Sequence, residues 1–325
     1  MGRSGRRLVR GAGDRALVSA PTPTPTPTPS PAASPALPVA IPLVVTLIFF
    51  AANSVLGRAA LGETAPGVAP DPAAFTALRL VSGAAMLALI VTTREGASGA
   101  AGLLARARWI SALSLLGYAA FFSAAYIGVA AGLGALLLFG AVQVTMFAGA
   151  LWGGERPPPM RWLGAGCGMA GLAWLTAPGA EAPPLVPALL MAGSGVCWGV
   201  FSLVGRGSTR PVADMAGAFA LAAAAAVPLW LGAAALGLAP GLGLREAGLA
   251  VASGAVTSAL GYAMWYGVLP RIDATLASVA QLTVPLIALA GGALWLGEVP
   301  TARFWVAAAL ILGGIGAATL VSRRR

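Results

Sequence analysis

The 325-residue chain is strongly apolar, because hydrophobic residues make up 58% of it and charged residues only 9%. A soluble globular domain carries about a quarter charged residues, so this composition indicates a membrane protein and leaves no room for a large soluble catalytic domain. The net charge of +10 comes from 20 arginines and 10 acidic residues. These arginines are scattered among short loops and the termini and form no basic helix face, which argues against nucleic acid as a partner.

Residues 1–40 precede the first apolar segment. They hold five arginines and then a Pro-Thr alternation from Pro21 to Pro29. Such a composition cannot bury apolar surface, so it predicts a disordered cytoplasmic tail. Its proline content is too high for a cleaved signal peptide, and we expect the first spanning helix to act as an uncleaved signal.

Ten apolar segments follow, each about 20 residues long and therefore able to cross a bilayer as a helix. We expect them at residues 41–61, 73–93, 108–127, 132–152, 160–177, 185–205, 212–236, 246–268, 273–296 and 302–322. Glu155 and Glu298 each stand in a short proline-containing connection. We expect each connection to end one helix and start the next, with the acid complementing the dipole of the helix that follows.

Three short motifs occur twice in the same order. The pairs are Ser54–Arg58 and Ser202–Arg206, Leu116–Tyr118 and Leu260–Tyr262, and Leu151–Glu155 and Leu294–Glu298. Their order and spacing predict a duplication into residues 41–180 and 181–325. Because each half would hold five spans, an odd number, the halves should lie in opposite orientations. The predicted fold is an all-α polytopic membrane protein whose ten transmembrane helices form two inverted five-helix repeats.

The arginines also predict the orientation in the membrane. With the N-terminus inside, the inside segments carry 16 arginines, the outside loops carry only Arg245 and Arg303, and Arg58 and Arg79 lie within spans. Positive charge gathers in cytoplasmic loops. We therefore expect a multi-pass protein of the cell (inner) membrane with both termini in the cytoplasm.

These features together resemble the EamA-like branch of the drug/metabolite transporter superfamily, over about residues 41–322. The second half matches better: Trp198 and Gly199 stand at the Trp-Gly of the family, whereas the first half has Phe50 and Ala51 there. Pro285 fits the proline of the family, but the aligned residue in the first half is Val142. The resemblance implies a secondary carrier with a central cavity, most often one that exports amino acids, related metabolites or toxic small molecules.

Polar residues at bilayer depth are the candidate substrate-binding residues, since they cost free energy unless they are paired or face a cavity. They are Asn53, Tyr118, Gln143, Trp198, Tyr262, Trp265, Gln281 and Arg79. The alternatives are interfacial anchoring by Tyr and Trp, and structural bonds between helices by Asn and Gln.

Three arginines in or near spans need separate explanations. Arg79 lies about six residues inside its span and is either an anchor for an anion or carboxylate or, as we favour, a structural residue paired with Glu63 or Asp71. Arg58 and Arg206 lie near span ends, where snorkelling explains them. Cys167 and Cys197 are expected to be inert and buried.

The predicted function is secondary active transport of small molecules, most often export of amino acids or related metabolites, by alternating access. The expected partners are a small-molecule substrate and the lipid bilayer, for a monomer or a homodimer. Uptake or facilitated diffusion is the alternative within the fold. Protons are a candidate coupling ion, although His is absent and no carboxylate lies deep in a span.

Two alternatives of another class are a non-transporting scaffold and an intramembrane enzyme. The chain has no His and no Lys, which removes most general bases, most metal sites and the phosphate-binding P-loop. We therefore expect no catalytic residue, metal or cofactor.

Overall fold

The computed structural model describes residues 37–62, 69–101, 109–154, 156–179, 182–206, 208–272 and 274–322. Residues 1–36, Glu63 and Glu155 lie outside these ranges, so the predictions made for them stay predictions. Residues 35–325 form one compact unit. Its described residues are helices joined by short turns, without strands, and the all-α prediction is confirmed for them.

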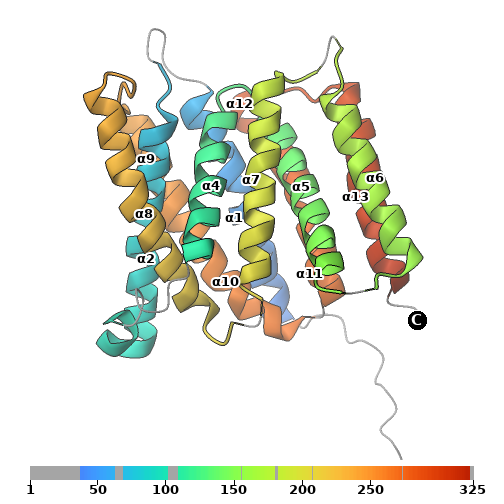
Figure 1. Ribbon diagram of the computed structural model, residues 1–325, viewed down its shortest axis with the longest axis horizontal. Coiled ribbons are helices and arrows are strands. Elements are labelled where there is room, and N and C mark those ends of the chain that lie inside the picture. Colours follow the sequence, from blue (N-terminus) through green and yellow to red (C-terminus); the bar gives the residue numbers. More distant parts are fainter. Residues whose placement is uncertain are drawn as a thin grey trace, which may run out of the picture. The chain divides into compact units, whose positions relative to one another are not determined.

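The predicted spans coincide with helices in the same order (Figure 1). The helices are α1 (Leu37–Leu61), α2 (Pro72–Ala101), α4 (Trp109–Ala125), α5 (Ala131–Trp152), α6 (Pro159–Thr176), α7 (Leu185–Val204), α8 (Pro211–Ala235), α9 (Leu244–Val251), η1 (Ala252–Leu260), α10 (Gly261–Val268), η2 (Leu269–Arg271), α11 (Ala274–Gln281), α12 (Val284–Leu296) and α13 (Ala302–Ser322). The eighth predicted span corresponds to α9, η1 and α10 together, and the ninth to α11 and α12. Among the described residues, six helical segments are long and apolar enough to cross a membrane, and three further apolar helices are shorter.

Two spans of the second half are irregular. The π-helix η1 interrupts the eighth span, and a turn at Leu282–Thr283 divides the ninth into α11 and α12. Pro285 stands in the first turn of α12, where its missing N–H leaves the carbonyl of Gln281 without the usual helical donor. The aligned Val142 allows α5 to continue without a break. The two halves therefore differ where their sequences differ, and their inverted relationship stays a prediction.

Glycines allow close helix contacts inside the bundle. A Cβ at Gly195 of α7 would collide with the backbone carbonyl of Leu138 in α5, and one at Gly199 would meet Thr145. Such close packing holds helices together in a membrane, because lipid gives them no hydrophobic reason to associate. Gly168 of α6 differs, because its Cβ position has open space.

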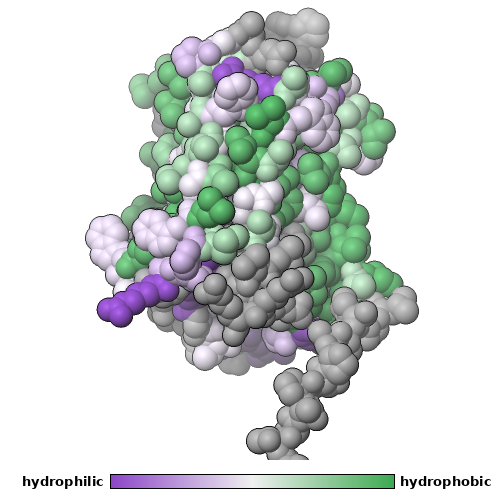
Figure 2. Space-filling model, turned by 90° about the vertical axis from the view of Figure 1, so that its right-hand side faces the viewer, coloured by the Kyte–Doolittle hydropathy of each residue, from purple (hydrophilic) through white to green (hydrophobic). Residues whose placement is uncertain are grey.

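Large apolar side chains point outward from the bundle. Trp162, Trp174 and Trp305 are each about half exposed, at 55%, 48% and 52%. Figure 2 shows apolar residues over the side where α6 and α13 lie, with polar residues towards its ends. An apolar outer surface of this extent fits contact with lipid rather than with water.

The lower end of the bundle is where α5, α7 and α10 finish, at the bottom of Figure 1. The upper end is where α1, α4 and α12 finish. The arginine distribution predicts that the lower end faces the cytoplasm.

Candidate substrate-binding cavity

A cavity of about 960 Å³ occupies the lower half of the bundle, as far as the described residues define it. This volume suits a small-molecule ligand. Its lining comes from α1, α4, α5, α6, α7, α10 and α11 and from the turns at the lower end. Seven of the eight predicted residues line it: Asn53, Tyr118, Gln143, Trp198, Tyr262, Trp265 and Gln281.

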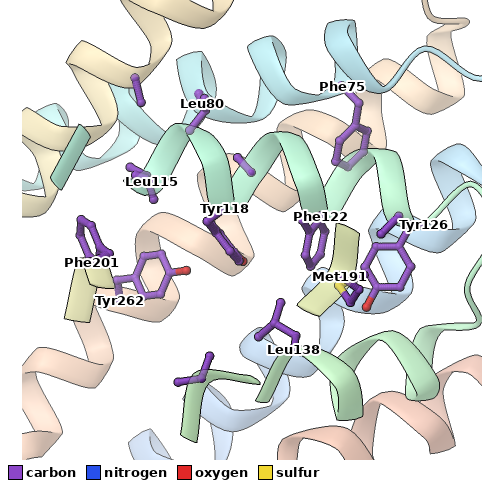
Figure 3. Packing of buried hydrophobic residues seen from close by; sticks show 14 of the residues in the cluster. Phe75, Leu80, Leu115, Tyr118, Phe122, Tyr126, Leu138, Met191, Phe201 and Tyr262 are labelled. Atoms are coloured by element: carbon purple, nitrogen blue, oxygen red, sulfur yellow. The ribbon is translucent and has the colours of Figure 1, made fainter. Parts of the chain in front are cut away.

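Aromatic rings form a continuous platform in this cavity. The Trp198 ring stacks on Tyr262 at 5.1 Å and 22° and on Phe201 at 5.3 Å and 21°, and its centroid lies 5.0 Å from that of Tyr118. Figure 3 shows Tyr262 of α10 pointing toward Tyr118 of α4, with Phe201 beside them. Tyr118 and Tyr262 are 6% and 4% exposed. Interfacial anchoring therefore does not explain them, since both rings lie within the helix bundle.

Asn53 connects the two halves of the chain. Its Oδ1 accepts hydrogen bonds from Thr257 at 2.6 Å, Ser253 at 2.9 Å and Ser258 at 3.3 Å. These three hydroxyls belong to η1, and π-helical turns inside α-helices are frequent at functional sites. The sequence analysis missed them, although three hydroxyl residues within six positions of an apolar span were a visible signal.

Arg79 lies behind the cavity and not in it. Its side chain is 1% exposed, and Nη2 donates to Tyr118 Oη at 2.8 Å and to Ser258 Oγ at 3.3 Å. The guanidinium carbon is 4.5 Å from the centre of the Phe122 ring, a cation–π contact. The expected pairing with Asp71 is wrong, because that carboxylate accepts from the backbone N–H groups of Ala74 and Gly241. Glu63, the other expected partner, lies outside the described residues.

The upper end of the bundle is closed by an ion pair between the halves. Arg58 Nε lies 3.2 Å from Glu298 Oε1, and Arg58 Nη1 donates to the carbonyls of Tyr126 and Ile127. Glu298 also accepts from the N–H of Ala131, the first residue of α5, at 2.8 Å. The snorkelling prediction for Arg58 is therefore wrong. Glu298 also differs from its prediction, because it complements the N-terminus of α5 instead of the next helix, α13.

The lower mouth of the cavity is cationic. Arg161 and Arg206 are among the lining residues, and among the described lining residues there is no Asp or Glu. Asp214 lines a small adjoining pocket of about 30 Å³ and accepts a hydrogen bond from Ser208 Oγ at 2.6 Å. The cavity thus combines a cationic mouth with an aromatic floor.

A helical bundle with a lipid-facing surface and a solute-sized cavity open toward one end defines the class of polytopic membrane transport proteins. The EamA-like transporter family matches residues 185–320. An uncharacterized protein of Pseudomonas aeruginosa is 46% identical over 271 residues, which cover 83% of this chain and 90% of that protein. The chain belongs to the EamA-like transporter family.

Two further comparisons are more distant. The aromatic amino acid exporter YddG of Ancylobacter novellus is 29% identical over 317 residues, covering 86% of this chain and 98% of that protein. A solved crystal structure aligns with a TM-score of 0.50 and 23% identity, covering 87% of this chain and 96% of that one. This structural likeness supports the fold alone.

Proposed function

We propose that the chain is a secondary transporter that exports small aromatic metabolites, amino acids among them, from the cytoplasm across the inner membrane. The observation that carries this proposal is the aromatic cavity, which lies in the lower half of the bundle beneath a closed upper end. The exporter from Ancylobacter novellus, at 29% identity, supports an aromatic substrate. The positive-inside distribution of arginines supports a cytoplasmic opening.

The substrate contacts in this proposal are the seven predicted residues that line the cavity. Trp198 and Tyr262 supply the surface on which an aromatic ring stacks, because offset or parallel ring pairs add favourable energy beyond buried area. Gln143 and Gln281 line the cavity from different halves of the chain and supply polar contacts. Trp265 and Phe50, whose rings lie 5.8 Å apart, extend the aromatic wall.

Transport by alternating access requires a second state in which the lower end closes and the upper end opens. The duplicated motifs favour such a state, since inverted repeats can exchange the conformations of their halves. Protons are the candidate coupling ion.

Metabolite export from cells tests this function. The chain would be expressed in a host without related carriers, and medium and cell metabolites would be compared with those of a Trp198→Ala variant at equal membrane abundance. Trp305→Ala is the matched control, because Trp305 is 52% exposed on the outer surface. We expect aromatic metabolites to accumulate in the medium with the unmutated chain and with Trp305→Ala, and to do so at least several-fold less with Trp198→Ala.

Two results would contradict the proposal. Aromatic metabolites that rise inside the cell would indicate uptake. An unchanged medium, with folded protein in the membrane, would exclude export of the aromatic compounds that the host makes.

A further inference from the structure

We infer that the cavity recognises its aromatic substrate by a carboxylate. The ligand class is therefore an aromatic carboxylate, with or without an amine. This inference rests on the proposed function, because it concerns the same cavity.

The first observation is an uncompensated charge. Arg79 Nη1 is buried and has no hydrogen-bond partner among the described residues, and the carboxylates described by the structure form no ion pair with Arg79. A charge buried within a bundle is unfavourable unless it is paired. An anionic ligand in the neighbouring cavity would supply the missing negative charge.

Tyr118 connects Arg79 to the cavity wall through a hydrogen bond. The oxygen of Tyr118 accepts a hydrogen bond from the guanidinium at 2.8 Å, while the same residue lines the cavity. A phenol that accepts from a cation has its own proton left to donate, and hydrogen bonds with a charged partner are about twice as strong as neutral ones. The Tyr118 hydroxyl also interacts with that of Tyr262. When Tyr262 donates in that pair, Tyr118 can donate to a ligand oxygen, and Arg79 is a positioning residue behind it.

The Asn53 side chain also has only hydrogen-bond donors left for a ligand. Its Oδ1 already accepts three hydroxyl hydrogen bonds, whereas its Nδ2 has no partner among the described residues. An amide nitrogen offers two N–H donors and no acceptor. Asn53 lines the cavity, so the group it has left for a ligand suits a carboxylate oxygen and not an ammonium.

Among the described lining residues, an ammonium group finds no carboxylate. Arg161 and Arg206 are the charged residues of this described lining. Like charges repel across a low-dielectric space, whereas a carboxylate would be attracted by Arg161 and by Arg79. The positive charge and the hydrogen-bond donors of the cavity wall thus favour the carboxylate of a zwitterionic substrate over its ammonium group.

Equilibrium binding to the purified chain in detergent tests the inference with three probes of one shape. The probes are 3-phenylpropionate, L-phenylalanine and 2-phenylethylamine, measured by calorimetry. We expect 3-phenylpropionate to bind at least as tightly as L-phenylalanine, and 2-phenylethylamine about tenfold or more weakly. Equal or tighter binding of the amine would overturn the inference and leave the proposed function standing. Absence of binding by all three would count against both.

Three variants show whether Arg79 sets this preference. Arg79→Gln should remove the preference for the anion over the amine, and Arg79→Lys should largely restore it. Tyr118→Phe keeps the ring and should weaken only the two carboxylates. Tyr126→Phe is the control, because the Tyr126 hydroxyl donates to the carbonyl of Ala131 and Tyr126 is not among the described residues that line the cavity. If Arg79→Gln weakens the binding of all three probes by the same factor, Arg79 has only a structural role.

Discussion

At the scale of single residues, Asn53 combines a structural role with a place in the cavity wall, whereas Gln143 has only the place in the wall. Asn53 is 3% exposed and holds three hydroxyls of η1, whereas Gln143 is only half-buried. Asn53→Ala should lower the free energy of unfolding by about 1–3 kcal/mol, since the hydroxyls lose their acceptor. Gln143→Ala should leave thermal unfolding in detergent unchanged while it reduces export.

A direct comparison of the two variants checks this assignment. Thermal unfolding would be followed beside export for both, with Asn53→Asp as a third chain that keeps an acceptor for the hydroxyls. Unchanged melting of Asn53→Ala would show that the three hydrogen bonds contribute no net stability. A lowered melting temperature in Gln143→Ala would make that residue structural.

The sequence predicts cavity-lining residues well where the surrounding span is apolar, because a polar side chain is then conspicuous. Asn53, Gln143 and Gln281 were found in this way. The partners of the arginines could not be predicted, since they depend on contacts across the fold: Arg58 meets Glu298 from the other half, and Arg79 meets Ser258 of η1. Helical or strand periodicity relates only neighbouring positions, so it does not predict these long-range partners.

At the scale of elements, the contact between α2 and η1 depends on Gly254. A Cβ at this position would collide with the backbone carbonyl of Arg79. Gly254→Ala should therefore push the two helices apart and destabilise the fold by about 1–3 kcal/mol, moving Ser258 away from Arg79. Gly248→Ala, in the preceding helix α9, is the matched control because nothing lies within 4 Å of its Cβ position.

Folded yield and thermal unfolding of the two glycine variants measure this effect. Alanine favours a helix over glycine by about 1 kcal/mol, so Gly248→Ala should be neutral or stabilising. If Gly254→Ala behaves in the same way, the close approach of α2 and η1 is not needed for the fold.

The helices themselves follow from apolar length, and their predicted ends agree with the structure within a few residues for most spans. The helix ends that differ have local causes that averaged hydropathy does not detect. Gly96, with φ of 74°, ends the regular part of α2 while helix continues to Ala101. The π-helix η1 could not be predicted from its own sequence, and its hydroxyl groups bond to Asn53 and Arg79 on two other helices.

At the scale of the whole molecule, the ion pair between Arg58 and Glu298 should govern which end of the cavity is open. Their side chains are 21% and 12% exposed. Removing one partner of such a sheltered pair costs about 1–3 kcal/mol, and every 1.4 kcal/mol shifts a two-state equilibrium about tenfold. We therefore expect Arg58→Gln to weaken the upper closure and to raise the population of chains open at the upper end.

The duplicated motifs extend this argument to the lower end. Arg206 and Glu155 occupy the same motif positions in the opposite halves, and Arg206 lines the lower mouth. If the repeats are inverted, this second pair is the counterpart of the first and would stabilise the state in which the lower end is closed. Neutralising Glu155 should then favour opening at the lower end, opposite to the effect of Arg58→Gln.

Thiol accessibility measures the shift that Arg58→Gln causes. A Val142→Cys reporter in the cavity would be placed in a chain lacking Cys167 and Cys197 and labelled with a membrane-impermeant reagent, either on intact cells or on inverted vesicles. With the ion pair intact, labelling should be fast in inverted vesicles and slow on cells, because the cavity opens at the end predicted to be cytoplasmic. Arg58→Gln should accelerate labelling on cells, whereas Arg303→Gln should not, since Arg303 joins α13 to the carbonyls of Trp174 and Ala177 away from the cavity. Fast labelling on cells with the ion pair intact would reverse the orientation inferred from the arginines, and equal rates for all variants would mean that Arg58 and Glu298 do not control access.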